Sequence, residues 1–182
     1  MAPLPDLSAD TLRRAARGDA RARRALVDRH GPMLYSICRR LSPEPEDCYQ
    51  EIWEKVFRGL HRFDPSGPAR LSSWLATIAH RHLIDRHRRR QVRGEAIPLG
   101  ELSADTPQAD TLMAARENHQ RLEAALRRLP EGQRRVVVLH HINGMPLNKI
   151  AEQEGVAVGT IKSRLHRGRA RLTQLLVREK TP

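Results

Sequence analysis

The 182-residue sequence lacks the features that define several large classes of protein. Its two cysteines, Cys38 and Cys48, are too few for a disulfide scaffold or a four-cysteine zinc site. No stretch approaches the roughly 20 consecutive apolar residues of a membrane span, and the N-terminus lacks the basic-then-apolar order of a signal peptide. We therefore expect a cytoplasmic protein and exclude a secreted, disulfide-stabilised one.

Patterns of catalytic and metal sites are also missing from the sequence. It has no glycine-rich phosphate loop, and His80 and His82 fall on different faces of their predicted helix. The pair His140 and His141 has no Glu-x-x-His companion. We therefore expect no enzymatic activity, no metal and no cofactor, and we expect the two cysteines to be small buried side chains.

Negative charge is the scarcer sign, and its distribution is uneven. The chain has 33 Lys and Arg against 21 Asp and Glu, a formal charge of +12. Residues 1–90 carry 18 basic and 11 acidic side chains, residues 91–112 carry one and four, and residues 113–182 carry 14 and six. Positive charge favours a polyanionic partner, because Lys and Arg release counterions condensed on phosphates. The sequence therefore predicts two basic segments separated by an acidic one.

Apolar residues recur at helical spacing through the first half of the chain, and strand-like alternation is absent. Capping residues at Ser8 and Asp19 predict a short helix up to Gly18 and a second helix to about residue 41. The Gly31–Pro32 pair is expected to kink or split this second helix. Two further helices are predicted after Pro45 and over residues 71–90.

Residues 91–112 contain two Pro, two Gly and no helical period, which predicts a flexible linker. Helical patterns resume over residues 113–129 and again up to the turn at Asn143 and Gly144. We therefore predict an all-α protein with two small four-helix domains, residues 1–90 and 113–182, on either side of this linker.

The segment from Leu147 to Leu165 has the layout of a helix-turn-helix. Ala151 is small enough for two helices to cross closely, and Gly155 can adopt the positive φ of the turn. The second helix would place its first residues in the major groove of DNA. The candidate DNA-binding residues there are Val158, Gly159, Thr160, Lys162, Ser163, Arg164, His166 and Arg167.

An acidic segment interrupts the basic first half. Glu44, Glu46 and Asp47 suit the first turn of a helix, where the dipole favours negative charge, but Glu51 and Glu54 lie beyond that turn. An acidic face would repel DNA phosphates, so we expect it to bind a basic protein surface. By contrast, residues 80–93 contain six Arg and one Asp, a pattern typical of either a nucleic-acid contact or a solvated surface.

Three stretches together resemble the extracytoplasmic-function (ECF) sigma factors, a compact group of the sigma-70 family that directs bacterial RNA polymerase to promoters, often in stress responses. They are EDCYQEIW at residues 46–53, WLATIA at residues 74–79 leading into Asp85 and Arg88, and residues 129–167, which end in GTIKSRLHR. The resemblance extends over residues 19–176. It implies a factor for transcription initiation.

The resemblance assigns roles to the first domain. It implies that the acidic helix binds the clamp helices of the largest polymerase subunit through Asp47, Gln50, Glu51 and Glu54. It also implies that this domain opens the promoter's minus-ten element and holds an extruded base, which costs a few kcal/mol of unstacking. The residues implied in DNA binding there are Ser73, Thr77, His80, Arg81 and Arg88. Arg81 stands where the family commonly has Asn, which leaves the choice of base open.

The resemblance also assigns the second domain and the regulation. The helix after Gly155 is implied to read the minus-thirty-five element as duplex DNA, and the linker to run toward the RNA exit path. No regulatory domain is expected after Pro182, so an anti-sigma factor is expected to hold the protein inactive. The alternative is an autonomous helix-turn-helix repressor, which would not need the acidic helix.

Overall fold

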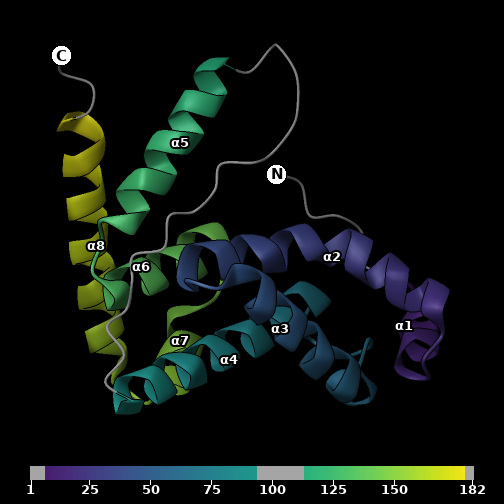
Figure 1. The fold of residues 1–182 in the computed structure, drawn as a ribbon. Helices are drawn as coiled ribbons and strands as arrows, with labels where there is room; N and C mark the ends of the chain where they lie inside the picture. Colours follow the sequence, from purple (N-terminus) through teal and green to yellow (C-terminus); the bar gives the residue numbers. More distant parts are fainter. Residues whose placement is uncertain (1–6, 94–112, 179–182) are drawn as a thin grey trace. The chain divides into compact units, whose positions relative to one another are not determined.

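The structure is a computed structural model that describes residues 7–93 and 113–178, and all regular secondary structure in these ranges is helical (Figure 1). The chain divides into two compact units. Helices α1, α3, α4 and the part of α2 up to Cys38 belong to the first unit. Helices α5 to α8 belong to the second unit, which also includes Arg39–Pro43. The predicted all-α class with two helical units is confirmed.

Helix α1 (Ala9–Ala16) begins and ends where its sequence predicts. The Ser8 hydroxyl oxygen accepts a hydrogen bond from the Thr11 backbone N–H at 3.2 Å, which satisfies one of the unpaired donors of the first turn. Gly18, just after the helix, has a φ of +97°, a conformation that suits glycine.

Helix α2 (Ala20–Leu41) is capped by Asp19, whose carboxylate accepts from the Ala22 N–H at 2.8 Å. The helix continues through Pro32, so the expected split is wrong. Fully buried Leu26 and Leu34 lie on either side of the proline, and we attribute the continuity to this burial, which offsets the lost backbone hydrogen bond. A Cβ on the neighbouring Gly31 would lie only 2.6 Å from the Tyr49 hydroxyl.

Helix α3 (Pro45–Gly59) and helix α4 (Leu71–Arg93) complete the first unit, with a 3-10 turn (Leu60–Arg62) between them. Helix α4 extends three residues further than the 71–90 helix that the sequence predicts, so Gln91–Arg93 belong to a helix and not to the linker. The remainder of the predicted linker, residues 94–112, lies outside the described residues. The core side chains that are fully buried include Leu26, Leu34, Ile37, Ile52, Val56, Leu71 and Leu75.

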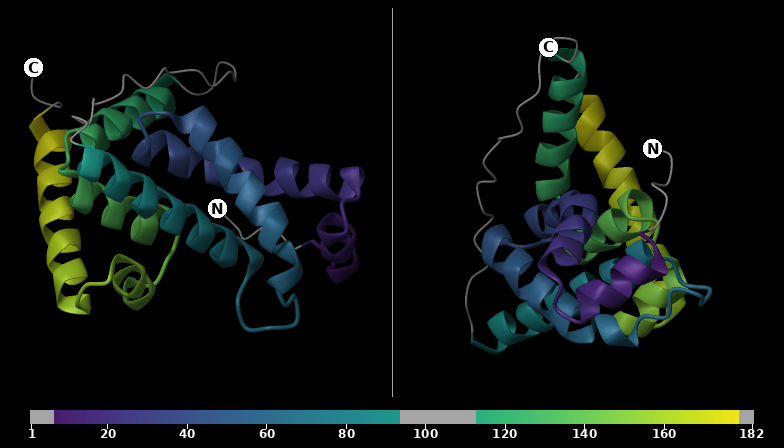
Figure 2. Two further views of the ribbon diagram at one scale, coloured as in Figure 1. Left: turned by 60° about the horizontal axis from the view of Figure 1, so that its bottom comes forward. Right: turned by 90° about the vertical axis from the view of Figure 1, so that its right-hand side faces the viewer.

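The second unit contains α5 (Met113–Arg127), α6 (Glu131–Val137), α7 (Leu147–Glu154) and α8 (Val158–Arg178). A π-helical turn (Val138–Ile142), which the sequence does not predict, extends α6. Its last residues lead to the expected Asn143–Gly144 turn, where Gly144 has a φ of +67°. Helix α8 contacts α5, α6 and α7, so it is the element on which this unit is assembled (Figure 2).

The predicted helix-turn-helix is formed by α7 and α8. Gly155 follows α7 with a φ of +67°, and its N–H participates in the cap by donating to the Ala151 carbonyl. Ile161 is fully buried and Leu165 is nearly so, which fixes α8 against the unit's core. Gly168 lies where an added Cβ would come within 2.9 Å of a Val137 methyl group, so α6 and α8 pack closely at this point.

The turn conformation predicts a specific loss of stability. Replacement of Gly155 by Ala would force a residue with a side chain to hold a φ of +67°, and we expect a loss of about 1 kcal/mol in the free energy of unfolding of the second unit. Denaturant unfolding measures it.

The matched control is Gly159→Ala. Gly159 lies in the first turn of α8 without a positive φ, and no atom lies within 4 Å of an added Cβ. We expect unchanged or slightly increased stability there, because alanine favours helix. Equal effects of the two substitutions would contradict the assigned role of Gly155.

Candidate protein-binding and nucleic-acid-binding surfaces

Three of the four acidic or amide residues predicted to bind polymerase share an exposed face of α3. Asp47, Gln50 and Glu54 are exposed and lie at helical positions i, i+3 and i+7, which place them on one side. Ile52 and Val56, from the opposite side of the helix, are fully buried in the unit's core. The sequence of α3 therefore separates a packing face from a solvated, negatively charged face.

The fourth residue, Glu51, has a different environment, because it is paired with α4. Its carboxylate contacts Arg86 Nη1 at 2.8 Å and His82 Nε2 at 2.9 Å. Arg86 also pairs with Glu44, which accepts a further hydrogen bond from Arg90 Nη2 at 2.5 Å. Glu44 and Glu51 thus form what we call the α3–α4 ionic clamp with His82, Arg86 and Arg90.

The clamp changes the electrostatics of Arg86. Burial of its guanidinium opposes the charged form and lowers the pKa, but the hydrogen bond and charge of Glu51 outweigh burial, so that the pKa is raised above its usual value. His82 is itself buried and is held from its other ring nitrogen, since Nδ1 lies 2.8 Å from Lys55 Nζ. Part of the acidic and basic charge noted in the sequence is therefore used to join two helices.

Helix α4 presents four of its five predicted DNA-binding residues to solvent. Ser73, Arg81 and Arg88 are exposed, and Thr77 is partly exposed with its hydroxyl donating to the Ser73 carbonyl at 2.9 Å. His80 is the exception, since its side chain is 0% exposed. A side chain buried in the core does not reach a DNA base, so we remove His80 from the candidate DNA-binding residues.

The loop before α4 contains a small cavity of about 120 Å³. Leu7 and Leu12, from the segment around α1, also line it. Trp74, at the start of the helix, packs against Phe63 with ring centroids 5.4 Å apart, which agrees with a packing role for this indole. The residues that line the cavity are Leu7, Leu12, Phe63, Pro65, Gly67, Pro68, Ala69, Arg70 and Leu71.

Helix α8 separates its candidate DNA-binding residues from its buried face. Lys162, Ser163, His166 and Arg167 are exposed, and so are Val158 and Gly159, while Thr160 is partly exposed. Arg164 is held differently, because its Nη1 donates to the Glu154 carboxylate at 2.5 Å. Glu154, whose side chain is 6% exposed, also accepts from Arg135 Nε at 2.9 Å. Arg164 is thus tied to α7 within the helix-turn-helix.

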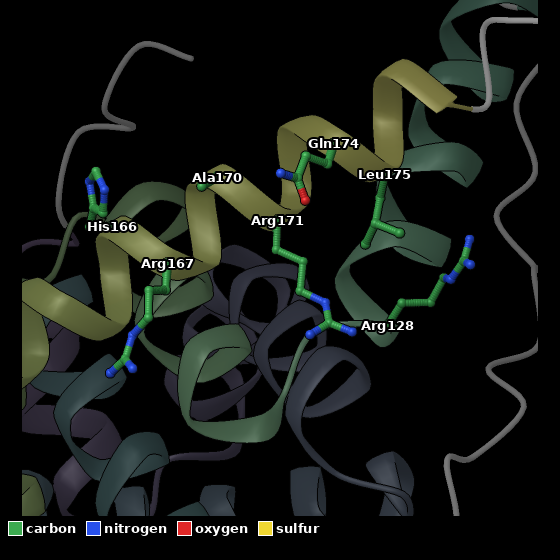
Figure 3. Close-up of a pocket in the computed structure, with 7 residues that line it drawn as sticks. All are labelled: Arg128, His166, Arg167, Ala170, Arg171, Gln174 and Leu175. Carbon is green, nitrogen blue, oxygen red and sulfur yellow. The ribbon is translucent and has the colours of Figure 1, made fainter.

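A basic hollow lies between the end of α5 and α8. This cavity of about 450 Å³ is lined by four basic side chains, Arg128, His166, Arg167 and Arg171, together with Ala170, Gln174 and Leu175. Figure 3 shows that Arg128 belongs to a different segment from the other labelled residues, which lie along α8. Arg128 is not among the residues predicted from the sequence to bind DNA, although the Arg127–Arg128 pair at the helix end is a signal that could have indicated it.

Two negative findings concern the described residues alone. No group of three or more His, Cys, Asp or Glu side chains in residues 7–93 and 113–178 is arranged to hold a metal ion. None of the helices in these same ranges combines the length and the apolar character needed to cross a membrane.

Comparison with known proteins identifies the family of the chain. The sigma-70 region 2 family matches residues 26–93, and the sigma-70 region 4 family matches residues 119–172. The chain is 33% identical over 174 residues to the RNA polymerase sigma factor CnrH of Cupriavidus metallidurans, covering 89% of this chain and 90% of CnrH. It is 36% identical over 172 residues to the ECF RNA polymerase sigma factor SigM of Mycobacterium tuberculosis, and this match covers 93% of this chain and 84% of SigM.

Two solved structures share the fold. CnrH in complex with the cytosolic domain of CnrY has a TM-score of 0.58 and 28% identity, covering 94% of this chain and 97% of that one. RpoE of Bartonella quintana in complex with the anti-sigma factor NepR has a TM-score of 0.64 and 26% identity, and this match covers 84% of this chain and 95% of the RpoE chain. The chain belongs to the sigma-70 family, within its ECF group of RNA polymerase sigma factors, which are transcription initiation factors.

The ionic clamp predicts unequal effects of two neighbouring glutamates on stability. Glu51→Gln removes the charge that faces Arg86 and His82, and we expect a loss of about 0.5 to 1 kcal/mol in the free energy of unfolding, because the pair is partly exposed. Glu54→Gln, on the exposed face one turn away, is the matched control and is expected to change stability by less. Thermal or denaturant unfolding compares them, and a larger loss for Glu54→Gln would refute the clamp.

Proposed function

We propose that this chain binds core RNA polymerase through the exposed acidic face of α3, and that it directs the enzyme to promoters through α4 and α8. The observation that carries the proposal is the separation of charge within single helices. Asp47 and Glu54 extend into solvent from a helix whose other face is buried, whereas the exposed charges of α8 are basic. One surface suits a basic protein and the other suits DNA phosphates.

The polymerase contact is assigned to Asp47, Gln50 and Glu54, with Glu51 at its edge. Because Glu51 already pairs with Arg86 and His82, it orients the acidic face and presents only part of its carboxylate to a partner. The clamp helices of the largest polymerase subunit, which the family resemblance implies as the partner, are the proposed docking site.

Promoter recognition is divided between the two units. We assign the minus-ten element to Ser73, Thr77, Arg81 and Arg88 of α4, with the loop cavity before this helix as the place for an extruded base. We assign the minus-thirty-five element to the exposed start of α8, where Lys162, Ser163, His166 and Arg167 extend from one face. Arg164, pinned by Glu154, is placed at the edge of that face.

Regulation is proposed to come from a protein partner. CnrH has been solved with the cytosolic domain of CnrY, and RpoE of Bartonella quintana with the anti-sigma factor NepR. By analogy, we propose that an anti-sigma factor holds this chain inactive. We further propose that the chain acts in the cytoplasm, where core polymerase is, and that it binds and positions without catalysing a reaction.

Charge reversal on the acidic face tests the polymerase contact. The double substitution Asp47→Lys and Glu54→Lys replaces two negative charges by positive ones while leaving the ionic clamp intact. We expect at least a tenfold weaker affinity for purified core polymerase, measured by fluorescence anisotropy at moderate salt, because a like-charge contact replaces an attractive one.

The control for this experiment makes the same change of net charge elsewhere. Asp10→Lys with Asp28→Lys reverses two exposed carboxylates on α1 and α2. This double variant is expected to bind core polymerase nearly as well as the wild type. Equal affinities of the two double variants would disprove the docking assignment. If the chain bound a DNA operator tightly but did not bind core polymerase, the alternative function of a helix-turn-helix repressor would be favoured.

A pair of substitutions on α8 tests base reading against phosphate contact. We expect Lys162→Ala to lower holoenzyme affinity for the preferred minus-thirty-five sequence by about 1 to 3 kcal/mol more than for a scrambled duplex. Arg169→Ala, further along α8, is expected to weaken both sequences equally, because phosphate contacts carry no direct sequence information. A uniform effect of Lys162→Ala would contradict a base-reading role.

A further inference from the structure

The only two cysteines of the chain meet in the core of the first unit, although they come from different helices. Cys38 lies near the end of α2 and Cys48 in the first turns of α3. A short connection joins these two helices (Figure 1). Both side chains are 0% exposed, and both are free thiols. Two cysteines kept only as small apolar side chains would not need to be neighbours.

The two sulfur atoms interact directly. The Cys38 thiol donates a hydrogen bond to the Cys48 sulfur, which raises the pKa of Cys38 and lowers the pKa of Cys48. Burial opposes the second effect, but His82 and Arg86 on α4 add to it, because both favour a negative sulfur. The pair therefore holds one proton preferentially on Cys38, and Cys48 is the more nucleophilic partner.

We propose that Cys38 and Cys48 are a modification site at which a peroxide forms an intramolecular disulfide between α2 and α3. The Cys48 thiolate attacks the O–O bond of hydrogen peroxide and becomes a sulfenic acid, while hydroxide leaves and takes up a proton to form water. The Cys38 sulfur then attacks the Cys48 sulfur, loses its proton and displaces a second water. Two thiols and one peroxide thus give one disulfide and two waters.

The neighbourhood of the pair gives the modification a consequence. Cys48 interacts with His82 and Arg86, which are members of the α3–α4 ionic clamp. Oxidation removes the negative sulfur from beside the Arg86 guanidinium and the His82 ring, and it joins the end of α2 covalently to the start of α3. The acidic face of α3 begins at Asp47, the residue next to Cys48.

Burial sets the rate of this reaction. Neither sulfur is reachable from solvent in the folded unit, so peroxide enters only when the connection between α2 and α3 opens locally. Oxidation is therefore slower than that of an exposed thiol, and it saturates as the peroxide concentration rises, because opening becomes limiting.

The test uses the purified full chain and hydrogen peroxide, followed by quenching and denaturation. We expect the number of titratable thiols to fall from two to none, the intact mass to fall by that of two hydrogen atoms, and the protein to remain a monomer on a non-reducing gel. Dithiothreitol should restore both thiols. Peptide mapping should show the Cys38–Cys48 link.

Single substitutions serve as matched controls. In Cys38→Ala, Cys48 has no resolving partner, and we expect a sulfenic acid that a dimedone probe traps, with no intramolecular link. In Cys48→Ala, we expect slower oxidation of the remaining thiol, because the hydrogen bond from His82 that helps to lower the pKa of Cys48 does not reach Cys38. Circular dichroism confirms that each variant is helical before oxidation.

Three results would overturn the proposal. They are two free thiols after prolonged excess peroxide, disulfide-linked dimers as the main product, or a monomer with Cys48 oxidised to sulfinic acid beside a free Cys38. None of these measurements requires polymerase or DNA. A failure of the disulfide is thus distinguishable from a failure of the proposed function, which the binding assays report separately.

Discussion

The ionic clamp between α3 and α4 is the interaction on which the charge distribution of the first unit depends. Glu51 lies on the helix with the exposed acidic face, and Glu44 is the capping residue just before that helix. Arg86 and Arg90 lie on the helix assigned to the minus-ten element. The pairs add to the contact that the two helices already make through their buried apolar side chains. The pairing also reduces the repulsion among the carboxylates at the start of α3, because Glu44 and Glu51 are each paired with an arginine of α4.

The clamp explains how one small unit carries surfaces of opposite sign. If every acidic residue of α3 were exposed, the helix would present a broad negative field close to the basic helix. Pairing Glu44 and Glu51 with α4 narrows the uncompensated negative surface to the side that carries Asp47 and Glu54. A similar pairing occurs in the second unit, where Glu154 forms ion pairs with Arg135 and Arg164. The exposed positive charge at the start of α8 then comes from the other basic side chains of this helix.

Much of the fold was predictable from local chemistry, because helix caps and turns depend on only a few neighbouring residues. Ser8, Asp19 and Gly155 indicated helix ends that the structure confirms. The split expected at Pro32 was wrong, because helix propensity depends on the local sequence, whereas the burial of the residues on either side of the proline depends on tertiary packing. The π-helical turn at Val138–Ile142 has no sequence signature that the periodicity analysis could detect.

The site was predictable in its outline but not in its pairings. Exposure of Asp47, Glu54 and Lys162 follows from helical spacing and stays consistent with the structure. The engagement of Glu51 by Arg86, 35 positions later, and the burial of His80 depend on how α3 and α4 pack, which spacing within one helix does not encode. Arg128 was missed for the same reason, because it joins the basic hollow only through the packing of α5 against α8.

The close approach at Gly168 has a mechanical implication for DNA recognition. A Cβ added at Gly168 would lie 2.9 Å from a Val137 methyl group, which is too close for packed carbon atoms. Any larger residue at this position would therefore push α8 away from α6. The exposed start of α8 belongs to the same helix. A displacement of α8 by a few tenths of an ångström at position 168 would therefore also change the orientation of the residues that we propose to bind DNA. Packing inside the second unit thus contributes to the position of the residues that we propose to bind DNA.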